Sequence, residues 1–208
     1  MPFVERPARL VVVVGTGTEV GKTWCSAQLL RHARSNSLRV AARKPAQSFD
    51  PQSTEPTDAE LLGAASDESP EAVCPRHRWY PVAMAPPMAA EILNKPVLLL
   101  DALLEEIRWA PGTHLGLIET AGGLRSPIAH DGDSRDLVRR VEPDEVLLVA
   151  DAGLGTINAV RLAIESLSFA KVTTLLNRFD PDNELHRRNR DWLEVRDCLR
   201  VIVDPRAF

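Results

Sequence analysis

The stretch Leu10–Thr23, which reads LVVVVGTGTEVGKT, decides the fold of this chain. It begins with an apolar run of β-branched residues, Val11–Val14, which is typical of a strand buried on both faces. A glycine-rich loop follows, and Gly-Lys-Thr then stands where a helical pattern starts. Backbone N–H groups in such a loop and at a helix N-terminus attract phosphate oxygens, so the stretch predicts a phosphate-binding loop.

Two side chains of this loop have the chemistry that a nucleotide requires. Lys22 can reach the outer phosphates, and the hydroxyl of Thr23 can ligate Mg²⁺. The spacing is one residue longer than the common GxxxxGK[ST] pattern, because five residues rather than four separate Gly15 from Gly21. A glycine-rich turn with an incidental lysine is the alternative. The buried strand before the loop and the helix after it favour the nucleotide interpretation.

Apolar runs short enough to be buried strands alternate with helical patterns along the chain. We expect strands near residues 10–15, 39–43, 115–119, 146–150, 171–176 and 199–203. We expect helices near residues 22–35, 58–65, 97–108, 134–141, 156–168 and 183–193. This alternation predicts an α/β fold of the P-loop NTPase type, with a doubly wound, mostly parallel sheet and helices on both faces. No linker divides the chain, so residues 1–208 are expected to form a single domain.

Composition and charge narrow the class of protein. The 208 residues are 44% apolar and 26% charged, with a formal net charge of −4, as in a soluble globular domain. Mild acidity argues against a nucleic-acid partner, and no apolar run reaches the roughly 20 residues that a membrane-spanning helix needs. The three cysteines show no CxxC spacing, which predicts neither a disulfide framework nor a zinc site. We therefore expect a cytoplasmic protein without a nucleic-acid or membrane partner.

A proline-rich segment separates the second and third expected strands by about 70 residues, which is longer than an ordinary connection. We expect short helices there, forming a lid or a wall. A disordered insertion is the alternative, but Trp79, Tyr80 and two methionines, Met84 and Met88, can anchor the segment.

Two strand ends offer a carboxylate for a metal ion, which prefers hard oxygen ligands. Glu119 ends one expected strand and is followed closely by Gly122 and Gly123, while Asp151 ends the next. Open α/β sheets bind ligands at the carboxyl ends of their strands, so both acids are candidates on pattern alone.

Three further residues are weaker candidates. Asp58 opens an expected helix behind Thr57, where complementing the helix dipole is a sufficient alternative explanation. Lys44 directly follows an expected strand and can face the phosphate loop, although a surface lysine is the commoner explanation. Ser48 follows four residues later and is weak by itself.

Taken in chain order, seven motifs resemble the dethiobiotin synthetase family, and the resemblance spans residues 10 to about 193. The motifs are GTGTEVGKT at 15–23, KPAQS at 44–48, TDA at 57–59, YPVAMAP at 80–86, ETAGG at 119–123, GLGTIN at 153–158 and LNR at 176–178. The extra residue in the phosphate loop is a hallmark of that family. The resemblance implies an ATP-dependent ligase that uses Mg²⁺. In such enzymes 7,8-diaminopelargonate and CO₂, supplied as bicarbonate, form a carbamate that attacks the γ-phosphate of ATP, and the mixed anhydride closes to the cyclic urea of dethiobiotin.

The resemblance also implies a role for each matching residue. The metal ligands would be Thr23, Asp58 and Glu119, which favours Glu119 over Asp151. The catalytic residues would be Lys22, Lys44, Thr18 and Ser48. The nucleotide would be bound by Gly17, Thr18, Glu19, Val20, Gly21, Lys22, Thr23, Glu119, Gly122 and Asn177. The substrate would be bound by Lys44, Ser48, Gly155, Thr156, Ile157 and Asn158, the last four serving its carboxylate across a homodimer interface. Capping or turn formation is the alternative for Asn158 and Asn177.

Three positions depart from the family pattern. Thr120 stands where a glycine is usual. We expect it to add bulk and to restrict the backbone angle φ close to the phosphates. Phe49 replaces a common glycine and Ala159 a common histidine, and the closing helix of longer members is not expected within 208 residues. These departures leave open a catalytically altered or silent nucleotide-binding paralogue.

Two other classes share the phosphate loop. A ParA/MinD-like switch ATPase carries an additional lysine at the place of Gly17. Such proteins act on DNA or membranes. The acidic charge of this chain and its lack of a basic amphipathic tail disfavour that activity. A cobyrinate-type amidotransferase synthetase normally needs an attached glutaminase domain, for which 208 residues leave no room.

Overall fold

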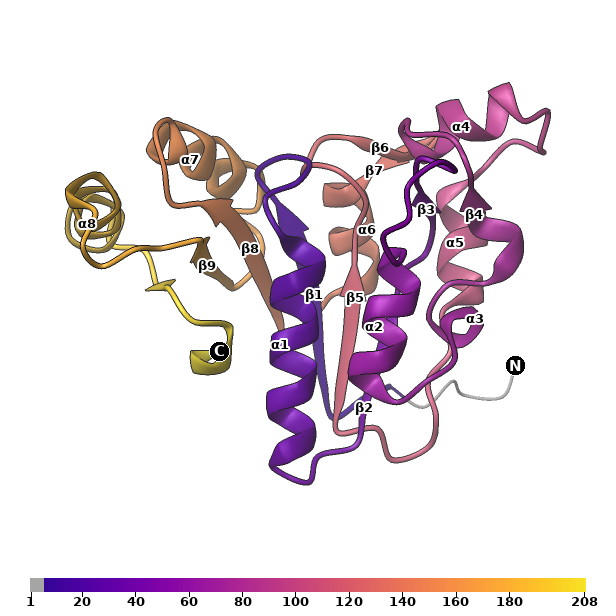
Figure 1. Ribbon diagram of the computed structural model, residues 1–208, viewed down its shortest axis with the longest axis horizontal. Coiled ribbons are helices and arrows are strands. Elements are labelled where there is room, and N and C mark those ends of the chain that lie inside the picture. Colours follow the sequence, from indigo (N-terminus) through magenta and orange to yellow (C-terminus); the bar gives the residue numbers. More distant parts are fainter. Residues whose placement is uncertain (1–5) are drawn as a thin grey trace.

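The computed structural model describes residues 6–208, in which six parallel strands form a central sheet of order β10-β9-β8-β1-β5-β2 (Figure 1). The strands are β1 (Arg9–Gly15), β2 (Val40–Arg43), β5 (Leu115–Glu119), β8 (Glu145–Asp151), β9 (Val172–Asn177) and β10 (Val201–Ile202). All six match strands expected from the sequence, within two residues at each end. The predicted doubly wound α/β fold is therefore confirmed.

Strand β1 is central because its side chains are apolar on both faces. Val12 and Val14 pack into one hydrophobic core, and Val11 and Val13 pack into the other. All four valines are fully buried, as the period-two geometry of a strand covered on both faces requires. β1 lies between β5 and β8, whose carboxyl ends flank the loop that follows it.

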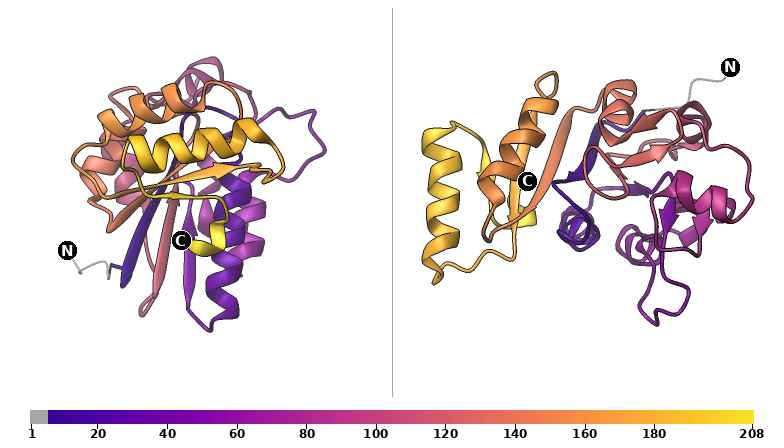
Figure 2. Two further views of the ribbon diagram at one scale, coloured as in Figure 1. Left: turned by 90° about the vertical axis from the view of Figure 1, so that its left-hand side faces the viewer. Right: turned by 90° about the horizontal axis from the view of Figure 1, so that it is seen from above.

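Helices cover both faces of the sheet, as the two views of Figure 2 show. The helices α1 (Lys22–Ser35) and α2 (Asp58–Ser66) pack on the face of Val11 and Val13. The opposite face is covered by α5 (Leu100–Glu106), α6 (Ser134–Val141) and α7 (Thr156–Ser166). The helix α8 (Glu184–Asp191) continues into a π-helical turn, Trp192–Arg196, whose buried Leu193 joins the core that contains Val12 and Val14. α5 is shorter than the expected helix over 97–108.

The proline-rich segment is ordered and forms a wall beside the sheet. It contains α3 (Pro70–Val73), a 3₁₀ turn (Arg76–Arg78), β4 (Trp79–Tyr80) and α4 (Pro86–Ile92). β4 pairs in parallel with the short strand β3 (Gln47–Ser48), and Trp79 and Tyr80 are both buried. The expectation of short helices and a wall is therefore confirmed, and the disordered alternative is wrong.

The remaining elements are short. They are the hairpin strands β6 (Pro127–Ala129) and β7 (Gly132–Asp133) and the 3₁₀ turn Pro205–Ala207. Within residues 6–208, no helix has both the length and the hydropathy needed to cross a membrane. The three cysteines, Cys25, Cys74 and Cys198, are free thiols.

Candidate active site

The phosphate loop connects β1 to α1 and depends on two glycines. A Cβ on Gly15 would lie 2.9 Å from the carbonyl oxygen of Gly17, so only glycine fits there. Gly21 caps α1 in the left-handed region at φ 89°, and a Cβ on it would lie 2.1 Å from Nδ2 of Asn177. Glu19 also adopts a positive φ, of 59°, which is costly for a residue with a side chain. The loop is therefore held in its shape by its surroundings.

The last residue of β9, Asn177, and the residue after it, Arg178, both donate hydrogen bonds to the phosphate loop. Asn177 donates a hydrogen bond from Nδ2 to the carbonyl oxygen of Val20 at 2.9 Å. Arg178 donates to the carbonyl oxygen of Glu19 at 2.8 Å and pairs with Asp151 at 2.8 Å. Asp151 thus anchors an arginine, whereas Glu119 lies at the centre of the polar cluster described below. The geometry separates the two acids, which the strand pattern left equal.

Lys22 folds back over the loop. Its Nζ donates to the carbonyl oxygen of Gly17 at 3.2 Å, and the residue is 7% exposed. Burial, reinforced by the charge of nearby Lys44, lowers the pKa of Lys22 to about 8. The folded chain therefore holds an ammonium with no counter-ion within residues 6–208, which is the arrangement expected of a group that receives an anion.

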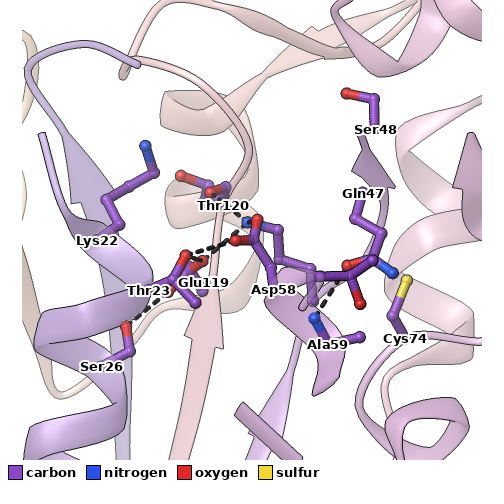
Figure 3. A network of polar contacts seen from close by, with 12 residues as sticks. Lys22, Thr23, Ser26, Gln47, Ser48, Asp58, Ala59, Cys74, Glu119 and Thr120 are labelled. Carbon is purple, nitrogen blue, oxygen red and sulfur yellow. Dashed lines mark hydrogen bonds and ion pairs between the residues drawn. The ribbon is translucent and has the colours of Figure 1, made fainter. Parts of the chain in front are cut away.

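A cluster of oxygen atoms lies directly below Lys22, at the first turn of α1 (Figure 3). Oγ1 of Thr23 lies 2.7 Å from Oδ1 of Asp58 and 2.8 Å from Oε1 of Glu119. Ser26, one helical turn later, donates to Oε2 of Glu119 at 2.7 Å. The hydroxyl of Thr23 has one proton and faces two carboxylate oxygens, so it can donate to only one of them. The contact between the Thr23 oxygen and the remaining carboxylate oxygen has no proton, which favours a cation at this place.

Lys44 supplies such a cation from the end of β2. Its Nζ lies 2.7 Å from Oδ2 of Asp58 and 2.8 Å from Oε1 of Glu119. Burial by itself would lower the pKa of Lys44, but the two carboxylates outweigh it and raise that pKa. Burial would likewise raise the pKa of Asp58, but Lys44 and the hydrogen bond from Thr23 hold it below its ordinary value. Lys44 is thus a buried, paired ammonium rather than a surface lysine.

Asp58 is positioned by the start of α2. Thr57 caps this helix, and the carboxylate of Glu60 accepts a hydrogen bond from the backbone N–H of Thr57, which completes a capping box. The N-terminus of α2 is therefore already satisfied without Asp58, whose carboxylate turns towards Thr23 and Lys44. Complementing the helix dipole does not account for this orientation.

These groups line or underlie a cleft of about 1220 Å³ at the carboxyl edge of the sheet. The predicted site residues that line it are Thr18, Glu19, Gly21, Lys22, Thr23, Lys44, Ser48, Asp58 and Gly122. Gly17, Val20, Glu119 and Asn177 lie below this lining and contact the residues that form it. The structure thus brings the predicted phosphate, metal and carbamate residues together around a single cleft.

Comparison with known proteins agrees with this geometry. A family model described as an AAA domain matches residues 9–183. An ATP-dependent dethiobiotin synthetase from Anaeromyxobacter sp. (strain K) is 39% identical, over 85% of this chain and 79% of the relative. One from Caulobacter vibrioides (strain NA1000 / CB15N) is 40% identical, over 74% of this chain and 72% of the relative.

The chain belongs to the dethiobiotin synthetase family. A plasmid partition protein from Borrelia burgdorferi B31, bound to AMPPNP, has a similar structure, with a TM-score of 0.55. The match covers 96% of this chain and 88% of that chain, at 16% sequence identity. At this identity the likeness shows a common fold and nothing about activity.

The segment Gly155–Asn158, which this family resemblance connects with the substrate carboxylate, lies outside the cleft of the same chain. Gly155 caps α7 at φ 87° with open space around it, and the preceding Leu154 is 92% exposed. Oγ1 of Thr156 is buried without a hydrogen-bond partner within residues 6–208. Within one chain, therefore, this segment does not line the cleft that contains the phosphate loop.

Thr120, which departs from the family pattern, does not strain the loop. It is absent from the residues with positive φ, and its Oγ1 donates to the carbonyl oxygen of Val13 at 3.3 Å. The side chain turns back towards β1, and the expected effect of Thr120 on the backbone beside bound phosphates stays a prediction.

Three residues of the site were not singled out from the sequence. Ser26 bonds Glu119, and its position one turn after Thr23 on the same helix was the available signal. Gln47 accepts a hydrogen bond from the backbone N–H of Ala59 at 2.9 Å, while its own Nε2 is buried without a partner within residues 6–208. Arg178 binds the loop carbonyl of Glu19 from a neighbouring strand, and no local spacing reveals such a contact.

Proposed function

We propose that this chain is an ATP-dependent dethiobiotin synthetase, which converts 7,8-diaminopelargonate and CO₂ into dethiobiotin. The observation that carries the proposal is the convergence of Lys22, Lys44, Asp58 and Glu119 from four separate segments at the end of β1. Phosphoryl transfer needs positioning and positive charge around the moving group, and this arrangement supplies both. Relatives named dethiobiotin synthetase support this reaction over the other uses of a phosphate loop.

The donor set near Thr23 suits Mg²⁺. Two carboxylates and one hydroxyl offer hard oxygen atoms, and the single proton of Thr23 cannot satisfy both carboxylate oxygens that it faces. When bound, Mg²⁺ would neutralise charge on the phosphate oxygens. Thr23, Asp58 and Glu119 would hold it, and Ser26 would orient the carboxylate of Glu119 through its hydrogen bond.

The remaining residues divide between the two substrates. The backbone N–H groups of residues 15–21 and the ammonium of Lys22 would bind the ATP phosphates. Asn177 and Arg178 would keep the loop open for them. Thr18 and Ser48 would orient the carbamate, and Lys44 would stabilise charge on the group that is transferred.

We also propose that the active form is a homodimer. Gly155–Asn158 lies outside its own chain's cleft, but the exposed N-terminus of α7 could complete the substrate site of a second copy. The alternatives are a silent nucleotide-binding paralogue and a switch ATPase that acts on DNA or membranes.

One assay separates these proposals. Phosphate release from Mg-ATP is measured with and without 7,8-diaminopelargonate and bicarbonate, and dethiobiotin is identified by mass spectrometry. We expect release that depends on both substrates and is absent in Lys22→Ala. Nucleotide binding without turnover would indicate the silent paralogue. ATP hydrolysis that DNA or lipid vesicles stimulate, without the diamine, would indicate the switch ATPase.

A further inference from the structure

The loop that follows β5 presents a further hydroxyl group to the cleft, that of Ser126. Gly122 and Ser126 of this loop line the cleft together with Thr18 of the phosphate loop. Ser126 stands three residues after Gly123, outside the ETAGG motif. Neither the family resemblance nor the proposed set of Mg²⁺ ligands gives it a role.

The loop that carries Ser126 is held firmly against the phosphate loop. The backbone N–H of Leu124 donates to the carbonyl oxygen of Gly15 at 2.8 Å. A Cβ on Gly123 would lie 3.2 Å from Cα of Gly17, so the two glycine-rich loops are in contact. The backbone N–H of Ser126 closes a turn by donating to the carbonyl oxygen of Gly123 at 2.9 Å. Backbone contacts therefore fix Ser126 relative to the phosphate loop.

The position of the Ser126 hydroxyl is fixed as well. Its Oγ accepts a hydrogen bond from the backbone N–H of Gly123 at 3.0 Å. Gly122 adopts a φ of 66°, and a Cβ on it would lie 2.9 Å from Oγ of Ser126 and 3.9 Å from Oγ1 of Thr18. The hydroxyls of Ser126 and Thr18 therefore lie close to the same glycine, where any side chain would meet both of them.

The hydroxyl of Ser126 retains a proton that it can donate. A hydroxyl has one proton and can also accept hydrogen bonds. Ser126 accepts from Gly123, and its own proton has no acceptor within the described residues 6–208. Ser48 differs, because its hydroxyl donates to the carbonyl oxygen of Met84 at 2.5 Å. Ser126 can thus donate to an oxygen atom in the cleft, whereas Ser48, bonded in this way, can only accept.

Two ammonium groups lie beside the two loops. Nζ of Lys44 is 3.4 Å from the carbonyl oxygen of Thr120, at the start of the loop that carries Ser126. Nζ of Lys22 donates to the carbonyl oxygen of Gly17, the glycine that contacts Gly123. Nearby positive charges favour an anion over an amine. An anionic oxygen is therefore the ligand that suits the free proton of Ser126.

We propose that Ser126 donates a hydrogen bond to an oxygen of the substrate carbamate, beside Thr18. This inference rests on the proposed function and adds a substrate-binding residue to it. Two hydroxyls on a rigid support would orient the carbamate towards the phosphate that it attacks, and phosphoryl transfer depends on such positioning. The carboxylate at the far end of the substrate stays with the N-terminus of α7 of a second copy, as proposed above.

The test measures the affinity of 7,8-diaminopelargonate by isothermal titration calorimetry. Mg²⁺ and a non-hydrolysable ATP analogue are present, so the readout does not require turnover. Each protein is titrated in CO₂-free buffer and in buffer with bicarbonate, which supplies the carbamate. We expect bicarbonate to tighten binding to the wild type.

Ser126→Ala should lower the affinity measured with bicarbonate about 10-fold, because a hydrogen bond to a charged group is lost. The affinity in CO₂-free buffer and the affinity for the nucleotide should not change. Ser126→Thr keeps the hydroxyl and should retain most of the effect of bicarbonate.

Ser53 provides a matched control. Its hydroxyl lines the same cleft and also accepts a backbone N–H, that of Glu55 at 3.2 Å, but it lies in the segment before α2. Ser53→Ala should leave all three affinities unchanged.

Two results would overturn the inference. One is an undiminished effect of bicarbonate in Ser126→Ala. The other is an equal loss of nucleotide affinity in that variant, which would show that Ser126 only shapes the glycine-rich loop. Diamine binding by the wild type that bicarbonate does not change would instead contradict the proposed function, and this inference with it.

Discussion

The ammonium of Lys44 lies 2.8 Å from the carboxylate of Glu119, and both side chains are almost completely buried. Asp58 is 2.7 Å from the same ammonium. Lys44 compensates the two carboxylates that we propose as Mg²⁺ ligands. Bound Mg²⁺ would take over that compensation, and Lys44 would then be available to the transferred phosphoryl group.

Lys44→Met should therefore destabilise the protein and increase its response to Mg²⁺. Removing one partner of a buried ion pair leaves an uncompensated charge, and we expect the free energy of unfolding to fall by about 3–5 kcal/mol. A bound cation would restore part of this. Thermal unfolding with MgCl₂, against NaCl at equal ionic strength, checks the prediction. Equal stabilisation of wild type and variant by Mg²⁺ would contradict it. Turnover should fall more than ATP affinity does.

Lys22→Met should weaken nucleotide binding without lowering the thermal stability of the protein. The ammonium of Lys22 is buried without a counter-ion within residues 6–208, and burial, which disfavours its charge, lowers its pKa to about 8. We expect nucleotide affinity to fall at least about 100-fold with the loss of charged hydrogen bonds. The melting temperature should stay equal or rise. Calorimetric titration with ATP and thermal unfolding provide the two measurements, and a clearly lower melting temperature would refute the interpretation.

Asn177→Ala should weaken nucleotide binding, because Asn177 supports the loop that would hold the phosphates. Its hydrogen bond to the carbonyl of Val20 supports a loop that contains two residues of positive φ, Glu19 and Gly21. Since one neutral hydrogen bond contributes about 1 kcal/mol, we expect affinity to fall about 5- to 10-fold. Asp151→Asn is the control, because Arg178 would still bond the carbonyl of Glu19. Loss of affinity in the control alone would contradict this account.

Glu145 should determine part of the acid sensitivity of the fold. Burial would raise its pKa, but hydrogen bonds from Thr173, Lys171 and Arg9 together hold it below the ordinary value. A lowered pKa in the folded state stabilises the protein above the unfolded value of about 4.3, and this contribution is lost as pH falls through the folded value.

Glu145→Gln should thus lower the free energy of unfolding by about 1–3 kcal/mol at pH 7 and flatten its decline below about pH 4.5. Urea unfolding between pH 3 and pH 7 measures both effects. Glu165→Gln, at an exposed position of α7 without an ion pair within residues 6–208, should change neither. The prediction would fail if the free energy of unfolding declined below about pH 4.5 as steeply in the Glu145 variant as in the wild type.

Much of the fold could be predicted because its signals are local. The alternation of apolar runs with helical patterns predicted all six strands of the central sheet, and α1 and α6 begin and end at the expected residues. The two-residue strands β3 and β4 were not predictable, because two residues carry no period and their pairing joins segments 32 positions apart.

The sequence by itself determined the phosphate loop and the positions of acids and lysines at strand ends, since backbone geometry and side-chain period follow from neighbouring residues. The family motifs already favoured Glu119 over Asp151, but the contact of Glu119 with Thr23 is visible only in the tertiary structure. The tertiary structure alone also decided that Asn177 supports the loop and that Arg76 lies over the ring of Trp79. It also decided that Gly155–Asn158 lies outside its own chain's cleft. Each of these depends on how strands and loops distant in sequence pack against one another, and side-chain packing across such distances leaves no pattern along the chain.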